Sequence, residues 1–194
     1  TIFFKSKNSF PKINLDFDVN YKRITNFLYY NNIAEPSQFY YPIHYFHVLL
    51  QKKWTYRNFN FNQKVHFQKS YNNMNNYNYD IISVPFLIFN QSVIYNFNVF
   101  KNASLKTILN FKIHTNYYPN NYMPLNSSFY HQNSFNLGGR PYLSGGVFLE
   151  KDYFSFGVLF ENIESSILEN NYYIQDYISN PVAFRLYIKW KFLD

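Results

Sequence analysis

Residues 184–194 read Phe184-Arg185-Leu186-Tyr187-Ile188-Lys189-Trp190-Lys191-Phe192-Leu193-Asp194. Side chains alternate between the two faces of an extended strand, so this stretch would place only large apolar groups on one face. Those groups are Phe184, Leu186, Ile188, Trp190 and Phe192. The other face would carry Arg185, Lys189 and Lys191 beside Tyr187. Such a contrast is typical of a transmembrane β-barrel strand, which crosses the bilayer in about 9–11 residues between lipid and a wet lumen.

The composition excludes membrane-spanning helices. Hydrophobic residues make up 47% of the 194 residues, yet the mean hydropathy is −0.37, because apolar residues are interleaved with Asn, Lys and Gln. No run of about 18 consecutive apolar residues occurs, which is what a transmembrane helix requires. Any part of this chain within a bilayer must therefore be a strand of a closed barrel, where every backbone group is paired.

Charge and cysteine usage narrow the functional classes further. The formal charge is +7, but charged residues are only 15% of the chain and form no long basic run, which argues against a nucleic-acid partner. There is no cysteine, hence no disulfide and no thiol chemistry. The chain begins at Thr1 without Met or a signal peptide, and we expect residues 1–5 to be the tail of a strand in a longer protein.

The alternation of apolar and polar residues recurs along the whole chain. It predicts eight strands, over 12–22, 45–51, 59–68, 87–98, 105–114, 143–150, 154–160 and from 182 onward. Short links are expected near 53–56, 100–103 and 150–153, and long links near 25–43, 70–84, 117–141 and 162–181. Bacterial barrels alternate short periplasmic turns with long extracellular loops in this way. The pattern predicts one antiparallel up-and-down transmembrane β-barrel domain over 1–194, with eight or more strands.

Aromatic residues, which are 24% of the chain, gather where the predicted strands meet the links. An A+T-rich genome would raise Phe and Tyr through codon bias, and barrels use aromatic rings at the membrane interfaces. On the long-loop side we expect a girdle from Tyr29, Tyr30, Phe39, Tyr40, Tyr41, Tyr117, Tyr118, Tyr122, Tyr172 and Tyr173. On the short-turn side we expect one from Trp54, Tyr56, Tyr153 and Trp190.

No motif for catalysis, metal binding or cofactor binding occurs in the sequence. His44 and His47 are three residues apart, so a strand would place them on opposite faces, where they cannot share a metal. The glycine-rich stretch 138–146 lacks the Walker spacing and its Lys, and Pro141 removes a backbone donor. We therefore expect no enzyme activity, no metal and no cofactor.

The functional signal is the set of charges on the predicted lumen faces. The cations of this set are Lys106, Lys112, Arg185, Lys189 and Lys191, against Asp16 and Asp18 on the first strand. A cationic lumen wall would raise the local concentration of anions. The alternative is that these are solvated charges without a role in transport.

From about Phe59 onward the chain resembles the putative-porin family of Bacteroidota outer membranes. The resemblance rests on short motifs, which include Phe67-Gln68, Val84-Pro85, Gly139 with Pro141-Tyr142, Glu161-Asn162 and the strand 184–192. The chain departs from the family at Tyr187, where a Gly is usual, and at Ser179-Asn180-Pro181, where Gly-Tyr-Pro is usual. The resemblance implies a bacterial outer-membrane barrel, contact with outer-membrane lipid, and a last strand read by barrel-assembly machinery. Family members are longer, which implies that this chain is a C-terminal portion.

Three functions remain open at this point. The first is a passive pore for small polar solutes, with a mild preference for anions. The second is a structural barrel without transport, a subunit of an outer-membrane protein assembly with membrane-protein partners. The third is a soluble β-barrel that binds a lipophile. Strand number separates the first two, since barrels of about eight strands are filled by their own side chains and about sixteen leave a channel.

Overall fold

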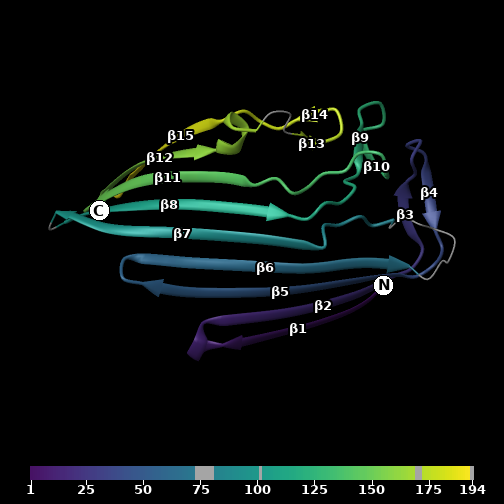
Figure 1. Ribbon diagram of the computed structural model, residues 1–194, viewed down its shortest axis with the longest axis horizontal. Coiled ribbons are helices and arrows are strands. Elements are labelled where there is room, and N and C mark those ends of the chain that lie inside the picture. Colours follow the sequence, from purple (N-terminus) through teal and green to yellow (C-terminus); the bar gives the residue numbers. More distant parts are fainter. Residues whose placement is uncertain (73–80, 101, 169–171, 193–194) are drawn as a thin grey trace.

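The computed structural model describes residues 1–72, 81–100, 102–168 and 172–192, and its main feature is one antiparallel sheet of nine strands (Figure 1). Their order in the sheet follows the order in the chain. The nine strands are β1 (Ile2–Phe10), β2 (Leu15–Ile24), β5 (Ile43–Tyr56), β6 (Phe59–Asn72), β7 (Leu87–Phe100), β8 (Ala103–His114), β11 (Tyr142–Lys151), β12 (Phe154–Glu161) and β15 (Ala183–Trp190). The antiparallel up-and-down arrangement predicted from the alternation is confirmed.

All eight expected strands are present, and residues 1–5 belong to a ninth. This strand, β1, extends to Phe10 and pairs with β2 along its whole length. The start of the first expected strand, 12–22, was wrong, because Pro11–Ile13 form a 3-10 turn (η1) and Asn14 has a left-handed backbone with φ 50°. The predicted link at 53–56 was also wrong. There β5 continues to Tyr56, and the turn falls at Arg57, whose φ is 51°.

Some expected links lie partly outside the described residues. These are the centre of the 70–84 link, at 73–80, Lys101 in the 100–103 turn, and 169–171 in the 162–181 link. Leu193 and Asp194 of the terminal stretch also lie outside them. The remaining short and long connections alternate as predicted. Figure 1 shows the short turns at one end of the sheet and the folded loops at the other.

The hydrogen-bond register places the side chains of the main sheet in two sets. Residues paired across an antiparallel ladder point to the same face. The apolar face carries a continuous series across the central strands, which includes Phe17, Val48, Val65, Phe89, Leu109, Val147, Val158 and Leu186. The polar face carries Asp16, His47, Lys64, Asn90, Lys112 and Tyr142 among others.

The apolar face is not covered by another layer of the described chain. Large hydrophobic side chains on it are exposed on most of the strands; Phe4, Phe46, Leu109, Val147, Phe156 and Leu186 are examples. The buried hydrophobic residues that the structure describes are few and lie mainly in the loops: Ala34, Phe39, Ile43, Ile81, Ala103 and Leu137. Soluble monomers rarely expose contiguous apolar patches beyond a few hundred Å². The sheet therefore has a second surface that requires an apolar environment.

The long loops fold into small structures of their own at one end of the sheet. Four short strands form a second sheet in the order β4-β3-β10-β9, namely β3 (Phe27–Tyr30), β4 (Pro36–Phe39), β9 (Asn121–Met123) and β10 (Ser128–Tyr130). The contact between β3 and β10 is parallel, at Tyr30 and Tyr130. A hydrophobic cluster of Phe39, Ile43 and Ile81 lies in the same region. The loop 162–182 holds the 3-10 turn η2 (Ile163–Ser166) and the hairpin β13 (Tyr172–Ile174) and β14 (Tyr177–Ile178).

The aromatic residues of the two expected girdles differ in their surroundings. On the short-turn side, Trp54 stacks on Phe61 with ring centroids 3.9 Å apart, and Phe154 contacts Trp190 at 5.7 Å, all on the apolar face. On the long-loop side, Tyr122 instead contacts Phe129 and Tyr177 within the loops. A girdle on that side would be formed by strand residues such as Tyr21, Phe46 and Tyr71, whose rings are neighbours on the apolar face.

The short turns are staggered along the sheet. Phe10, the last residue of β1, is followed across the ladder by Leu15, Lys52, Gln63, Gln91, Phe111 and Leu143. Leu143 of β11 is therefore level with the end of β1. The strand β11 itself ends eight residues later, at Lys151, so the turns are shifted along the strand direction from one side of the sheet to the other. The edges of the sheet are β1 and β15, which do not pair with each other in the described chain. The meander is established, and its closure into a barrel stays a prediction.

Among the described residues, no helix has the length and apolarity needed to cross a membrane.

Candidate functional site

The polar face of the main sheet has an excess of positive charge. By register, its cations on the nine strands are Lys5, Lys7, Lys22, Lys53, Lys64, Lys106, Lys112, Arg185 and Lys189. Its carboxylates are Asp16, Asp18, Glu150 and Glu161. On these strands of the polar face, nine cations therefore stand against four carboxylates.

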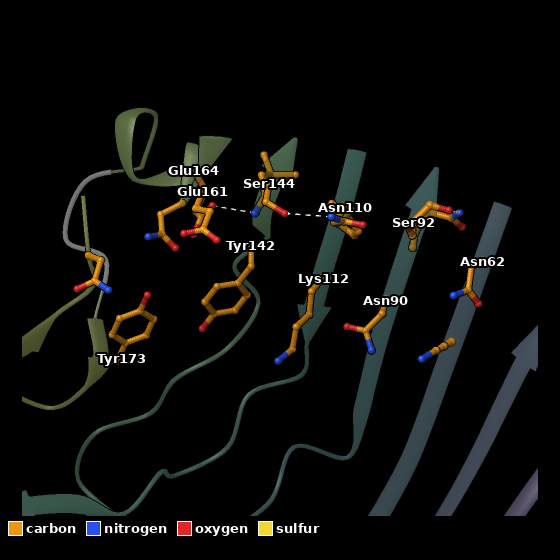
Figure 2. A pocket seen from close by; sticks show the side chains of 16 residues that line it. Asn62, Asn90, Ser92, Asn110, Lys112, Tyr142, Ser144, Glu161, Glu164 and Tyr173 are labelled. Carbon is orange, nitrogen blue, oxygen red and sulfur yellow. Dashed lines mark hydrogen bonds between the residues drawn. The ribbon is translucent and has the colours of Figure 1, made fainter. Parts of the chain in front are cut away.

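A groove with a volume of ≈ 590 Å³ lies on the loop-side half of this face. Its lining comes from strands β6, β7, β8, β11 and β12 and from the loop that follows β12. Figure 2 shows amide, hydroxyl and ammonium groups extending into it from adjacent strands. A groove lined in this way offers many hydrogen-bond partners.

Two rows of side chains cross the floor of the groove. The first is Asn62, Ser92, Asn110 and Ser144, which are successive partners in the ladder. Within it, Asn110 Nδ2 donates to Ser144 Oγ at 3.2 Å. The side chain of Asn62 accepts a hydrogen bond from Gln51 Nε2 at 2.9 Å. These side-chain contacts hold the row in place across the sheet.

The second row is Lys64, Asn90, Lys112 and Tyr142. The two lysines lie on β6 and β8, with Asn90 on the strand between them. Lys112 Nζ is 5.8 Å from the centroid of the Tyr142 ring, a cation–π contact that fixes its direction. The row therefore places one ammonium group on each side of the Asn90 amide.

Both carboxylates of the groove lie on its far side and have partners. The carboxylate of Glu161 forms an ion pair with the guanidinium of Arg185, with 2.8 Å between Oε2 and Nη2. Glu164, which is 3% exposed, accepts a hydrogen bond from the backbone N–H of Leu143 at 2.7 Å. Glu164 belongs to η2, so this bond ties the loop after β12 to the beginning of β11.

The five cations predicted to line a lumen share the polar side of the sheet but do not form one cluster. Lys112 lies in the groove, and Arg185 is paired with Glu161 beside it. Lys189 and Lys191 line a separate cavity of ≈ 440 Å³ at the turn end, together with Glu150 and Asp152. Lys106 pairs in register with Asn96 and Phe148 between the two sites.

The five residues predicted to face lipid are among the most exposed of the chain. Phe184, Leu186, Ile188 and Trp190 lie on the apolar face of β15, in register with the apolar residues of β12. Their exposed fractions run from 62% to 67%, and that of Phe192 is 85%.

The histidines follow the expected separation of His44 and His47 onto opposite faces. The contact between His47 and His66 was not predicted from the sequence. His47 Nε2 and His66 Nδ1 are 3.1 Å apart on the polar face, and Asn20 lies 3.2 Å from the other His47 nitrogen. No group of three metal-ligating side chains occurs in the part of the chain that the structure describes.

Reasoning from sequence alone did not find the groove. The alternation placed Asn62, Lys64, Asn90 and Lys112 on polar faces, but the groove depends on which residues of neighbouring strands are level with each other. Glu164 and Tyr173 come from a loop without any periodic pattern. The rows of amides on adjacent strands could have been noticed only with the register known.

Comparison with known proteins gives one result. No curated protein and no solved structure matches the chain. A model of one protein family, described as Putative porin, matches residues 1–194. This agrees with the expectation drawn from the short motifs, and its coverage extends to the part of the chain before Phe59. The chain belongs to this putative-porin family.

Proposed function

We propose that this chain forms a β-barrel in the bacterial outer membrane, alone or as part of a larger protein, through which small polar solutes diffuse passively. The observation that carries the proposal is the exposed apolar face opposite a charged and polar one on the same nine strands. Lipid would cover the first face, and water would fill the space against the second. The proposal assigns no catalytic step and no cofactor to the chain.

The stagger of the turns supports a barrel. Eight residues at about 3.4 Å each, over six strand spacings of about 4.8 Å, correspond to a strand tilt of about 40° when all turns lie at one membrane surface. Strands in outer-membrane barrels are tilted by about 35–45°. A sheet with this stagger is suited to closing once both edges find partners.

The charges on the apolar face also fit a membrane. By register this face carries Arg23, Lys52, Lys69 and Lys151. Arg23, Lys69 and Lys151 lie at or near strand ends, and Lys52 is level with the start of β2 beside the turn. Long basic side chains at these positions can reach the headgroup layer. None of these four charges lies in the middle of the apolar face.

The proposed selectivity is a mild preference for anions, from the excess of cations on the polar face. Reversal potentials of the intact protein in a planar bilayer across a KCl gradient would measure it. We expect chloride to be favoured, and less so at 1 M than at 0.1 M salt, because the Debye length falls from about 10 Å to about 3 Å. Lys189→Gln with Lys191→Gln should move the selectivity toward neutral. Lys52→Gln, which removes a charge from the apolar face, is the matched control.

A structural barrel without transport is the second candidate, and one observation favours it. Ile94, Ile108, Gly146 and Leu159 form an apolar row across the polar face, between the groove and the turn-end cavity. Phe148 lies beside this row, with its ring over Gly157. Such a row could fill a narrow lumen. If the intact protein gives no conductance, this candidate, with membrane-protein partners, replaces the pore.

A further inference from the structure

The groove on the polar face has a cationic pair without a carboxylate partner. Lys64 and Lys112 are two strands apart, so their Cα atoms are separated by roughly 10 Å, with Asn90 between them. Neither lysine forms an ion pair with a carboxylate of the described residues. Two ammonium groups on either side of an amide donor suit an anionic group with several oxygens, such as phosphate or carboxylate.

The adjacent row supplies neutral hydrogen-bond partners next to this cationic pair. Asn62 uses its side-chain oxygen for Gln51, which leaves its NH₂ group for a ligand. Asn110 uses its NH₂ group for Ser144, which leaves its carbonyl oxygen. Ser92 lies between them in the ladder. Donors and acceptors that alternate in this way match hydroxyl groups, each of which can donate and accept.

The far side of the groove adds acceptors and aromatic rings. The Glu161 carboxylate retains acceptor capacity beside its pair with Arg185. Tyr142 and Tyr173 both line the groove, and Figure 2 shows their rings on its β11 and loop side. Carboxylate acceptors and tyrosine rings suit the hydroxyl-bearing body of a solute more than a second anionic group.

We propose that this groove binds solutes that combine one anionic group with several hydroxyl groups, the chemical class of sugar phosphates and sugar acids. The anionic group lies between Lys64 and Lys112 over Asn90. The hydroxyl groups lie along Asn62, Ser92 and Asn110 toward Glu161. This inference rests on the proposed function, for which it names the solute class, because the groove occupies the face that would line the pore.

Direct binding to the intact protein in detergent micelles, measured by isothermal titration calorimetry, tests the site. The probes are glucose 6-phosphate, inorganic phosphate and glucose. We expect glucose 6-phosphate to bind at least tenfold more tightly than either of the others. Lys64→Gln and Lys112→Gln should each weaken its binding about tenfold, which corresponds to the loss of one hydrogen bond to a charged group. Lys64→Arg, which keeps the charge, should retain most of the binding and shows that the site tolerates substitution.

Lys7→Gln is the matched control, because it removes the same charge from the polar face on β1, away from the groove. Equal weakening by this control would overturn the proposal in favour of a general field effect. Equal affinity for inorganic phosphate and glucose 6-phosphate would also overturn it, since the row of amides would then contribute nothing. Conductance without binding of glucose 6-phosphate contradicts the site alone. Binding with the expected lysine dependence but no conductance supports the site and contradicts the pore.

Discussion

Replacing Leu109 with lysine tests whether the apolar face lies against lipid. Leu109 is in the middle of β8, is 52% exposed, and has Val93 and Gly145 as its partners across the ladder. If water covered this face, Leu109→Lys would lose only the burial of about half a leucine side chain, roughly 1 kcal/mol. If the bilayer midplane covers it, the charge should cost about 2–4 kcal/mol.

Ser92→Lys is the matched control, because Ser92 pairs with Asn110 at nearly the same depth but on the polar face. It should change the free energy of unfolding by no more than about 0.5 kcal/mol. Reversible unfolding by guanidinium chloride in lipid vesicles can be followed by fluorescence of Trp54 and Trp190, the two tryptophans of the chain. A difference between the two variants below about 1 kcal/mol would refute the assignment of this face to lipid.

Three further predictions concern the 115–141 loop and one glycine of the sheet. Protease added to intact cells should cut within 115–141 and spare Lys151; cleavage at Lys151 from outside would reverse the topology. Gly157→Ala should destabilise the protein by about 1–3 kcal/mol in chemical unfolding, because the added methyl group would overlap the ring of Phe148; an unchanged midpoint would show that the ring moves away. Burial lowers the pKa of His131 in its loop, because the folded loop favours the neutral ring. The stability that this preference contributes is present above the unfolded pKa of about 6.5 and is lost as pH falls below it. Protease sensitivity of this loop should therefore rise below pH 6, and His131→Gln should remove that pH dependence.

The sequence predicts the strands well because a sheet with one apolar and one polar face requires strict alternation. The strand that was recognised only in part, β1, places Ser6 and Asn8 on the apolar face, so its alternation is broken where the pattern was sought. The turn after β5 was predicted too early, next to Lys52 and Lys53, because two consecutive charged residues are typical of a link. In the sheet those two residues point to opposite faces near the turn end.

The site depends on information that periodicity does not contain. The row Lys64, Asn90, Lys112 joins three strands whose relative shift is set by backbone pairing, and a shift of two residues would separate the lysines. The side chain of the buried Glu164 accepts a hydrogen bond from the start of β11. No local sequence pattern predicts this contact. The sequence is sufficient to assign residues to the two faces of the sheet. The residues that line the groove can be identified only when the hydrogen-bond register between the strands is known.

The parallel contact between β3 and β10 has a consequence for the order in which the chain folds. Tyr30 and Tyr130 are about 100 residues apart, and closing a loop of that length in an unfolded chain costs roughly 4 kcal/mol of entropy. One short strand pair cannot offset that cost, so β3 and β10 meet only after the hairpins between β2 and β11 have brought them together. A disulfide between cysteines placed at these two positions would form late in folding, and its appearance would report that the intervening strands are already paired.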